Sequence, residues 1–120
     1  MHRDVLRNQD GTVVCARCAL AVRPWQRMKG LLGRASLGPD EGMLFRPAGS
    51  IHMAFMRFPI DAVFCDRDLV VLDVERDLQP WKVASRKGAK VVIELAAGAA
   101  AGVEPGDRLA LGPENEKAPA

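Results

Sequence analysis

The alternation of apolar and polar positions predicts that most of this chain forms short strands. Residues 12–22 alternate strictly, which indicates a half-buried strand. Residues 60–65 and 69–75 are apolar runs on either side of a polar break at 66–68, and this arrangement predicts a β-hairpin. The residues expected to share the inner face of the first strand are Val14, Ala16, Cys18, Leu20 and Val22.

Two further strands are expected in the second half of the chain. Residues 90–95 predict a strand with Val91, Ile93 and Leu95 facing inward, and with Val92 and Glu94 on the opposite face. A Pro-Gly turn then precedes residues 108–111, which we expect to form a closing strand. Short strands separated by Gly/Pro turns favour a mainly β fold, an antiparallel β-sandwich or barrel with one or two short helices.

Helical spacing is confined to two places. Pro24 suits the first helical position, and the apolar residues that follow it recur at steps of three and four until Gly33, a plausible C-cap. The alanine-rich residues 96–102 predict one or two further helical turns. The apolar face expected for the first helix consists of Trp25, Met28, Leu31 and Leu32.

The length of 120 residues suits one domain with one core. The pattern divides the chain into an N-terminal arm at residues 1–11, a domain at residues 12–111 and a tail at residues 112–120. The tail has Pro, Glu, Asn and Lys and no apolar pattern, so we expect it to be disordered.

Composition limits the expected cellular location of the protein and the classes of partner it is expected to bind. The 17 basic and 15 acidic residues give a net charge of +2, which does not indicate a nucleic-acid-binding protein. No apolar run is long enough to cross a membrane. The N-terminus lacks the apolar stretch of a secretory leader, and three cysteines fit reduced thiols. We therefore expect a cytoplasmic protein without nucleic-acid or membrane partners; the oligomeric state stays open.

Residues 50–66 concentrate the chain's candidate chemistry. His52, Met56, Arg57 and Asp61 lie within an otherwise apolar run, where ionisable groups are costly unless they are paired or used. For Asp61 the structural interpretation is favoured: a buried carboxylate usually has a cationic partner. The candidate partners for this ion pair are Arg27, Arg34 and Arg57.

No metal or cofactor is indicated by the sequence. His52 has no companion at a recognised ligand spacing, so a hydrogen-bonded histidine is favoured over a metal ligand. Cys15 and Cys18 have the spacing of redox and half-zinc sites. However, residues three apart on a strand face opposite ways, so we expect the two thiols to lie apart.

Three ordered blocks of the sequence carry a resemblance to a known family. They are RMKGLLGR (27–34) with GMLF (42–45), His52 with FMRFPIDAVF (55–64), and VIELAAG (92–98) with Gly102 and PGD (105–107). These blocks resemble the domain-of-unknown-function 192 family, a widespread prokaryotic group of small proteins. The resemblance covers roughly residues 12–111 and implies a mainly β fold with one or two short helices, but no chemistry. Relatives often carry Trp-Met-Lys-Asn-Thr where this chain has Phe55-Met56-Arg57-Phe58, so it resembles an arginine-containing variant.

Two functional hypotheses follow. The favoured one is a non-enzymatic binding or accessory module with a pocket around residues 43–61 for a small molecule or an extended peptide. The alternative is a hydrolase-type enzyme in which His52 and Asp61 form an acid-base pair, and a purely structural role for the segment also stays open. The expected ligand-binding residues are Met43, Phe45, His52, Met56, Arg57 and Phe58.

Overall fold

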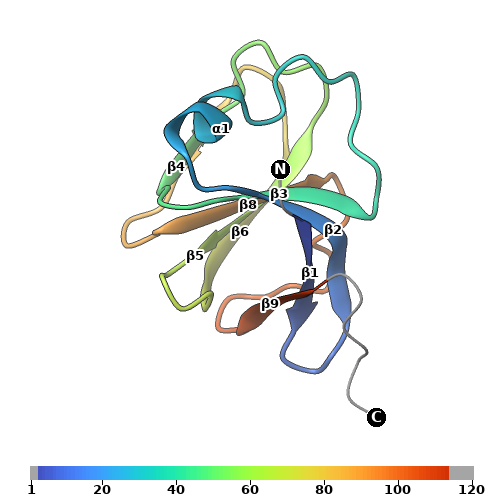
Figure 1. Ribbon diagram of the computed structural model, residues 1–120. Coiled ribbons are helices and arrows are strands. Elements are labelled where there is room, and N and C mark those ends of the chain that lie inside the picture. Colours follow the sequence, from blue (N-terminus) through green and yellow to red (C-terminus); the bar gives the residue numbers. More distant parts are fainter. Residues whose placement is uncertain (1–2, 114–120) are drawn as a thin grey trace.

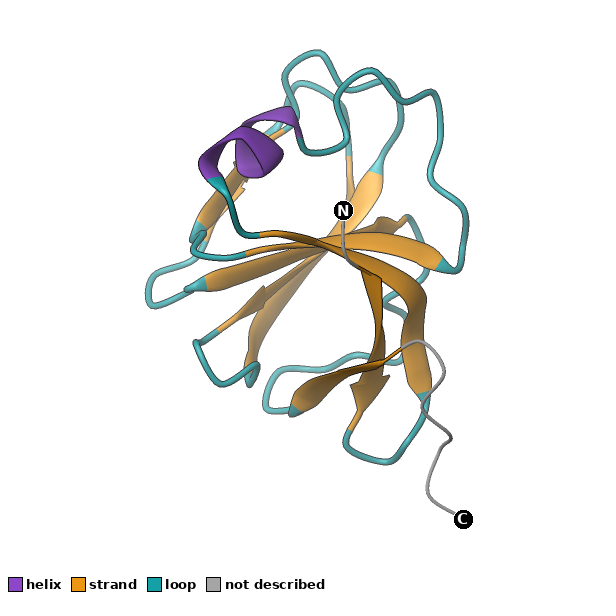
Figure 2. Cartoon of the chain, in the orientation of Figure 1, coloured by secondary structure: helices purple, strands orange, loops and turns teal. Residues whose placement is uncertain are grey.

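The computed structural model describes residues 3–113. Residues 1, 2 and 114–120 lie outside the described part, and with them most of the tail expected to be disordered. Figures 1 and 2 show strands with one short helix at one end of the molecule. The elements are β1 (Arg3–Asn8), β2 (Val13–Ala21), α1 (Pro24–Lys29), β3 (Glu41–Phe45), β4 (Ser50–His52), β5 (Ile60–Cys65), β6 (Val71–Leu78), β7 (Val83–Ser85), β8 (Val91–Ala96) and β9 (Leu109–Pro113).

Seven of the strands form one curved sheet in the order β6-β5-β8-β3-β2-β1-β9, and β4 pairs with β7 in a small second sheet. The pair β2–β3 is parallel and spans the crossover that contains α1, whereas the other pairs are antiparallel. Val70 and Arg108 form one isolated bridge between the two ends of the large sheet. The sheet is not closed into a barrel, and the predicted mainly β fold with a short helix is confirmed.

The predicted hairpin and its neighbour form the centre of the large sheet. β5 pairs with β6 as the sequence predicts, and on its other side it pairs with β8. Both faces of these central strands are covered, so all of residues 60–65 and 91–95 are buried. The expected alternation is correct, since Val91, Ile93 and Leu95 lie in one apolar cluster and Val92 lies in the other. The sequence analysis did not predict that the second face of β8 is buried as well.

A bulge alters the faces of β2. Leu6 pairs with Cys15 and Asp4 with Cys18, so two steps along β1 oppose three steps along β2. The additional residue changes the alternation, and Cys15 and Cys18 are buried in the same apolar cluster. The prediction that these thiols face opposite ways is therefore wrong. The expected inner face is correct in part, since Val14, Cys18 and Leu20 contact the same apolar cluster, whereas Val22 is exposed.

The helix is shorter and more exposed than predicted. α1 ends at Lys29, and its C-cap residue Gly30 has a positive φ of 48°. The chain then turns through Leu31 and Leu32 toward the sheet. Leu31 is buried, but Trp25 and Met28 are 62% and 79% exposed. With only six residues, α1 covers the sheet mainly through the segment that follows it.

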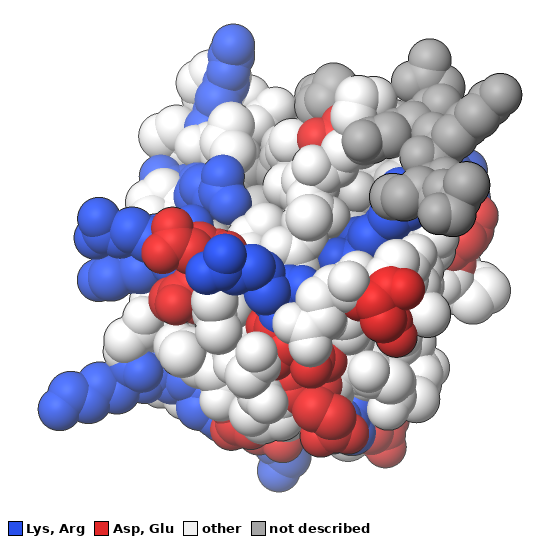
Figure 3. All heavy atoms as spheres, turned by 90° about the horizontal axis from the view of Figure 1, so that it is seen from below, with Lys and Arg blue, Asp and Glu red and all other residues white. Residues whose placement is uncertain are grey.

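Other segments differ in detail from the expectation. Residues 3–8, expected within an arm, form β1 and pair with both β2 and β9. Residues 97–102 form successive turns, with N–H groups bonded to carbonyl groups three residues earlier, such as Ala99 to Ala96. On the face shown in Figure 3, acidic and basic side chains are interspersed. Within residues 3–113, no helix has the length and apolar character needed to cross a membrane.

Candidate ligand pocket

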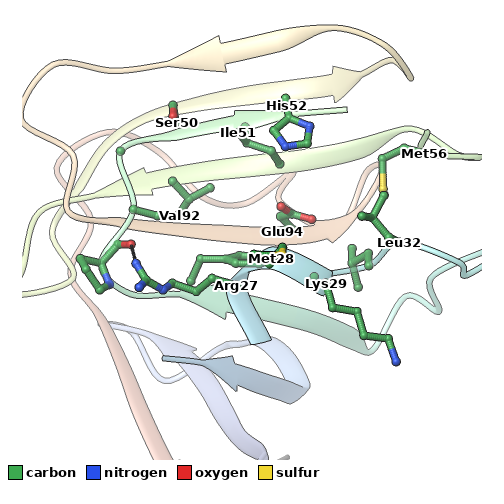
Figure 4. A pocket seen from close by; sticks show the side chains of 16 residues that line it. Arg27, Met28, Lys29, Leu32, Ser50, Ile51, His52, Met56, Val92 and Glu94 are labelled. Atoms are coloured by element: carbon green, nitrogen blue, oxygen red, sulfur yellow. Dashed lines mark hydrogen bonds between the residues drawn. The ribbon is translucent and has the colours of Figure 1, made fainter. Parts of the chain in front are cut away.

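A pocket of about 300 Å³ lies between the α1 segment, the small sheet and the face of β8 (Figure 4). Its walls come from parts of the sequence far apart, because the crossover from β2 to β3 carries α1 over the sheet and the loop after β3 returns through β4. The lining residues are Arg27, Met28, Lys29, Gly30, Leu31, Leu32, Phe45, Pro47, Ala48, Gly49, Ser50, Ile51, His52, Met56, Val92 and Glu94.

Glu94 is the buried polar group of this pocket. It is 7% exposed, and its carboxylate points into the cavity (Figure 4). Its neighbours on the adjacent strands are Met43 and Ala62, which offer no polar side-chain atom. Within residues 3–113, the carboxylate has no hydrogen-bond or ion-pair partner. Burial therefore disfavours the charged form and raises the pKa of Glu94 to about 8.

Arg27 supplies a positive charge to the same cavity from α1. Its Nη1 atom donates a hydrogen bond of 2.9 Å to the carbonyl oxygen of Pro47, which holds the guanidinium against the loop after β3. Its Nε is buried and has no hydrogen-bond partner among the described residues. Arg27 and Glu94 thus line one pocket, yet within the described chain they do not form an ion pair with each other.

His52 and Lys29 complete the set of ionisable groups lining the pocket. Both side chains are exposed, so they belong to its rim. In Figure 4 the His52 ring lies across the cavity from α1, while the Lys29 side chain extends away from Glu94. The floor is therefore acidic and buried, and the rim is basic and open to solvent.

Three of the six expected ligand-binding residues line the pocket: Phe45, His52 and Met56. The other three lie elsewhere. Met43 is buried beside a neighbouring hollow of about 220 Å³, Arg57 is exposed, and Phe58 is half-buried against the core.

Asp61 is buried, but its partners are not arginines. Its carboxylate accepts hydrogen bonds from the backbone N–H groups of Asp77, Gly98 and Ala100, at 2.9, 3.0 and 3.0 Å. These contacts hold the turn after β8 and the end of β6 against β5. The expected ion pair with an arginine is therefore replaced by three backbone donors, which satisfy a carboxylate without a second charge.

The arginines considered as partners for Asp61 make other contacts. Arg34 pairs with Glu41 at 3.1 Å, and Arg27 binds the carbonyl oxygen of Pro47. Arg57 is exposed.

The acid-base pair of the enzyme hypothesis is not assembled. Asp61 alternates with Ile60 and Ala62 along β5, and those two residues belong to the apolar cluster on the pocket face. Asp61 therefore points to the opposite side of the sheet, whereas His52 lines the pocket. The pocket lined by His52 does not include Asp61.

The buried thiols form a pair outside the pocket. The Cys18 thiol hydrogen-bonds to Cys15, which lowers the pKa of Cys15 and raises that of Cys18. Burial raises the pKa of the third thiol, Cys65, to about 12. Among the described residues, no three His, Cys, Asp or Glu side chains are arranged so that they could hold a metal ion.

Sequence reasoning missed the contribution of Glu94 and placed Arg27 in a different role. The signal for Glu94 was present: it is an ionisable residue inside the apolar run 91–95, the same argument that singled out Asp61. Alternation in β8 places Glu94 on the face opposite Val91, Ile93 and Leu95, and the sequence does not show that this face is buried as well. In the folded chain both sides of β8 are buried, and Glu94 lies beneath the pocket.

Comparison with known proteins gives a family and a fold. The profile of DUF192, described as an uncharacterized ACR, matches residues 5–111. No curated protein matches the chain.

Two crystal structures resemble the chain closely. One is a protein from Sinorhizobium meliloti proposed to be a transcription regulator, with 29% identity, a TM-score of 0.81, and coverage of 92% of this chain and 94% of that one. The other is a protein of unknown function from Novosphingobium aromaticivorans, with 26% identity, a TM-score of 0.77, and coverage of 90% and 83%. Because the DUF192 profile matches nearly the whole domain, the chain belongs to the DUF192 family of uncharacterized proteins.

Proposed function

We propose that this protein is a non-enzymatic binding module whose pocket between α1, β4 and β8 takes a small molecule. The observation that carries the proposal is the position of Glu94, a buried carboxylate directed into the pocket without a partner in residues 3–113. Burying such a group costs free energy, and a bound ligand that supplies a donor would recover it.

The make-up of the pocket supports this proposal. Its volume of about 300 Å³ is at the lower end of the range for small-molecule sites. The wall combines apolar side chains, such as Ile51, Met56 and Val92, with polar groups. Apolar walls supply burial and polar groups fix orientation, which is the usual division in such sites.

The geometry gives less support to the other roles. An acid-base enzyme using His52 and Asp61 would need both side chains in one cleft, and they face different sides of the sheet. The regulatory role proposed for the Sinorhizobium meliloti protein is not part of this proposal. A helix-turn-helix reader inserts a recognition helix into DNA, and α1, with six residues, is the one helix in the described chain.

Binding can be tested by recording amide NMR spectra of the ¹⁵N-labelled protein with a panel of small amines, carboxylates, zwitterions and neutral alcohols. We expect at least one of these classes to shift the amide signals of α1, β4 and β8 together. Glu94→Gln should change which compounds bind. Glu104→Gln makes the same chemical change at an exposed turn outside the pocket, so it should leave the binding unchanged.

The proposal fails if no class of compound shifts the pocket amides while the protein is folded. It also fails if the shifts gather elsewhere on the surface and are the same in Glu94→Gln as in the unmodified chain.

A further inference from the structure

A carboxyl group and a guanidinium group line the pocket without contacting each other. Glu94 lies beneath the cavity, and the Arg27 guanidinium is held at another part of the wall by the Pro47 carbonyl oxygen. Their separation exceeds the 4.0 Å limit of an ion pair. A buried acid and an arginine that face one cavity and leave each other unpaired are complementary to a ligand that carries both charges.

The wall between the two charges is apolar. Val92 and Glu94 are two residues apart on the same face of β8, a distance of about 7 Å along a strand. Figure 4 shows the Arg27 guanidinium toward the Val92 end of the cavity and the Glu94 carboxylate beyond it, with the Met28 side chain drawn between α1 and β8. A chain of methylene groups would therefore have apolar surface to cover between the two ends.

The other charged groups do not neutralise Glu94. β3 and β5 place Met43 and Ala62 beside it, and α1 and β4 bring Lys29 and His52 only to the rim. A single carboxylate is also a poor cage for a divalent cation, which takes several oxygen ligands. An organic amine needs one such acceptor.

We propose that the pocket recognises a small zwitterion with an ammonium group and a carboxylate at the two ends of a short aliphatic chain. The ammonium group donates to Glu94, the carboxylate accepts from Arg27, and the aliphatic chain lies over Val92 and Met28. This inference rests on the proposed small-molecule function and adds the class of ligand. A simple amine would leave Arg27 unused, and a simple carboxylate would leave Glu94 buried without a donor.

The test is a calorimetric titration with ω-amino acids of increasing length, from β-alanine to 6-aminohexanoate. For each length, the matched alkylamine and alkanoate carry one of the two charges. We expect one length to bind best, at least about tenfold tighter than either matched compound, since a charge-assisted hydrogen bond contributes about 1.5–3 kcal/mol and about 1.4 kcal/mol is tenfold in affinity.

Variants show which pocket residue binds each charged end of the zwitterion. Glu94→Gln should reduce binding of the best zwitterion to the level of the matched alkanoate. Arg27→Met should reduce it to the level of the alkylamine, and Arg27→Lys should restore part of the loss because it keeps the charge. Thermal unfolding of each variant shows whether it is folded, and Glu104→Gln is the control for an equal change of charge outside the pocket.

The dependence on pH gives a second readout. An ammonium group binds the ionised carboxylate, and Glu94 is mostly protonated below its pKa of about 8. Affinity for the zwitterion should therefore rise from pH 6 to pH 8 by up to about tenfold per pH unit and then level off. In Glu94→Gln this rise should disappear, although Arg27, Lys29 and His52 still face the pocket.

The outcomes separate the two proposals. If matched amines or alkanoates bind in the pocket as tightly as the zwitterions, the zwitterion inference is wrong while small-molecule binding stands. If the best zwitterion binds Glu94→Gln as tightly as the unmodified chain, the inference is likewise overturned. If no compound of any class affects the pocket, both proposals fail.

Discussion

Glu94 occupies a position that costs stability at neutral pH. The ordinary pKa of its carboxyl group is 4.5, and burial raises the value in the folded chain to about 8. Between these values the unfolded chain is ionised and the folded chain still holds the proton. Rising pH therefore favours the unfolded state throughout this window, and the loss of stability stops above pH 8. A residue retained at such a cost is a good candidate for a functional group.

Glu94→Gln should therefore stabilise the protein in a pH-dependent way. Glutamine has nearly the same shape and cannot ionise, so the variant should gain on the order of 3 kcal/mol over the unmodified chain at pH 7 and little at pH 5. Urea unfolding at the two pH values measures this. A variant equally stable or less stable than the unmodified chain at both would show that Glu94 is not held as an unpaired acid.

Asp61, unlike Glu94, stabilises the folded chain as a carboxylate, because it accepts hydrogen bonds from three backbone N–H groups. Asp61→Asn replaces one acceptor oxygen by an NH₂ group that faces donors, so we expect a loss of about 2–4 kcal/mol in the free energy of unfolding. Asp68→Asn, in the exposed turn before β6, should change stability by less than about 0.5 kcal/mol. Equal stability of the two variants in chemical denaturation would contradict the structural role of Asp61.

At the level of elements, β3 depends on a close approach at Gly42. A Cβ atom there would lie 2.7 Å from a Leu95 methyl group, 2.9 Å from the Cys15 sulfur and 3.0 Å from the Glu94 carbonyl oxygen. The parallel partner β2 and the antiparallel partner β8 thus leave no space for a side chain. Gly42→Ala should cost about 1–3 kcal/mol through overpacking.

Gly102→Ala is the matched control for Gly42→Ala. A Cβ atom there meets nothing within 4 Å, and Gly102 does not have a positive φ. Melting temperatures of the two variants should therefore differ clearly, with Gly102→Ala close to the unmodified chain. If Gly42→Ala and Gly102→Ala have the same melting temperature, β3 is not packed closely between β2 and β8 at Gly42.

The bulge in β2 brings two thiols together in the core, where Cys15 and Cys18 are 1% and 0% exposed. The Cys65 thiol is also buried. We expect all three to resist a thiol reagent such as Ellman's reagent in the native protein at pH 8 and to react rapidly after unfolding in guanidinium chloride. A thiol that reacts at the same rate before and after unfolding would mean that at least one of them is accessible.

Across the whole molecule, the sequence predicts the local elements better than their environment. The hairpin β5–β6 and strand β8 follow from apolar runs and a polar turn, because these signals lie within a few residues. The bulge in β2 and the burial of both faces of β8 depend on strands distant in sequence, so alternation alone predicts neither the joint burial of Cys15 and Cys18 nor the burial of Glu94. His52 was found because it is chemically distinct, whereas the role of Glu94 required knowing what covers β8.

The pocket exists only when the large sheet, the small sheet and α1 are assembled, so the ionisation of Glu94 reports on the entire arrangement. The most direct measurement is an NMR titration of the glutamate side-chain carboxyl carbons, with Glu94→Gln used for assignment. We predict one glutamate signal that titrates near pH 8 in the folded protein and is missing from the variant. A Glu94 signal that titrates near its ordinary value of 4.5 would contradict the buried, unpaired carboxylate on which the proposed site rests.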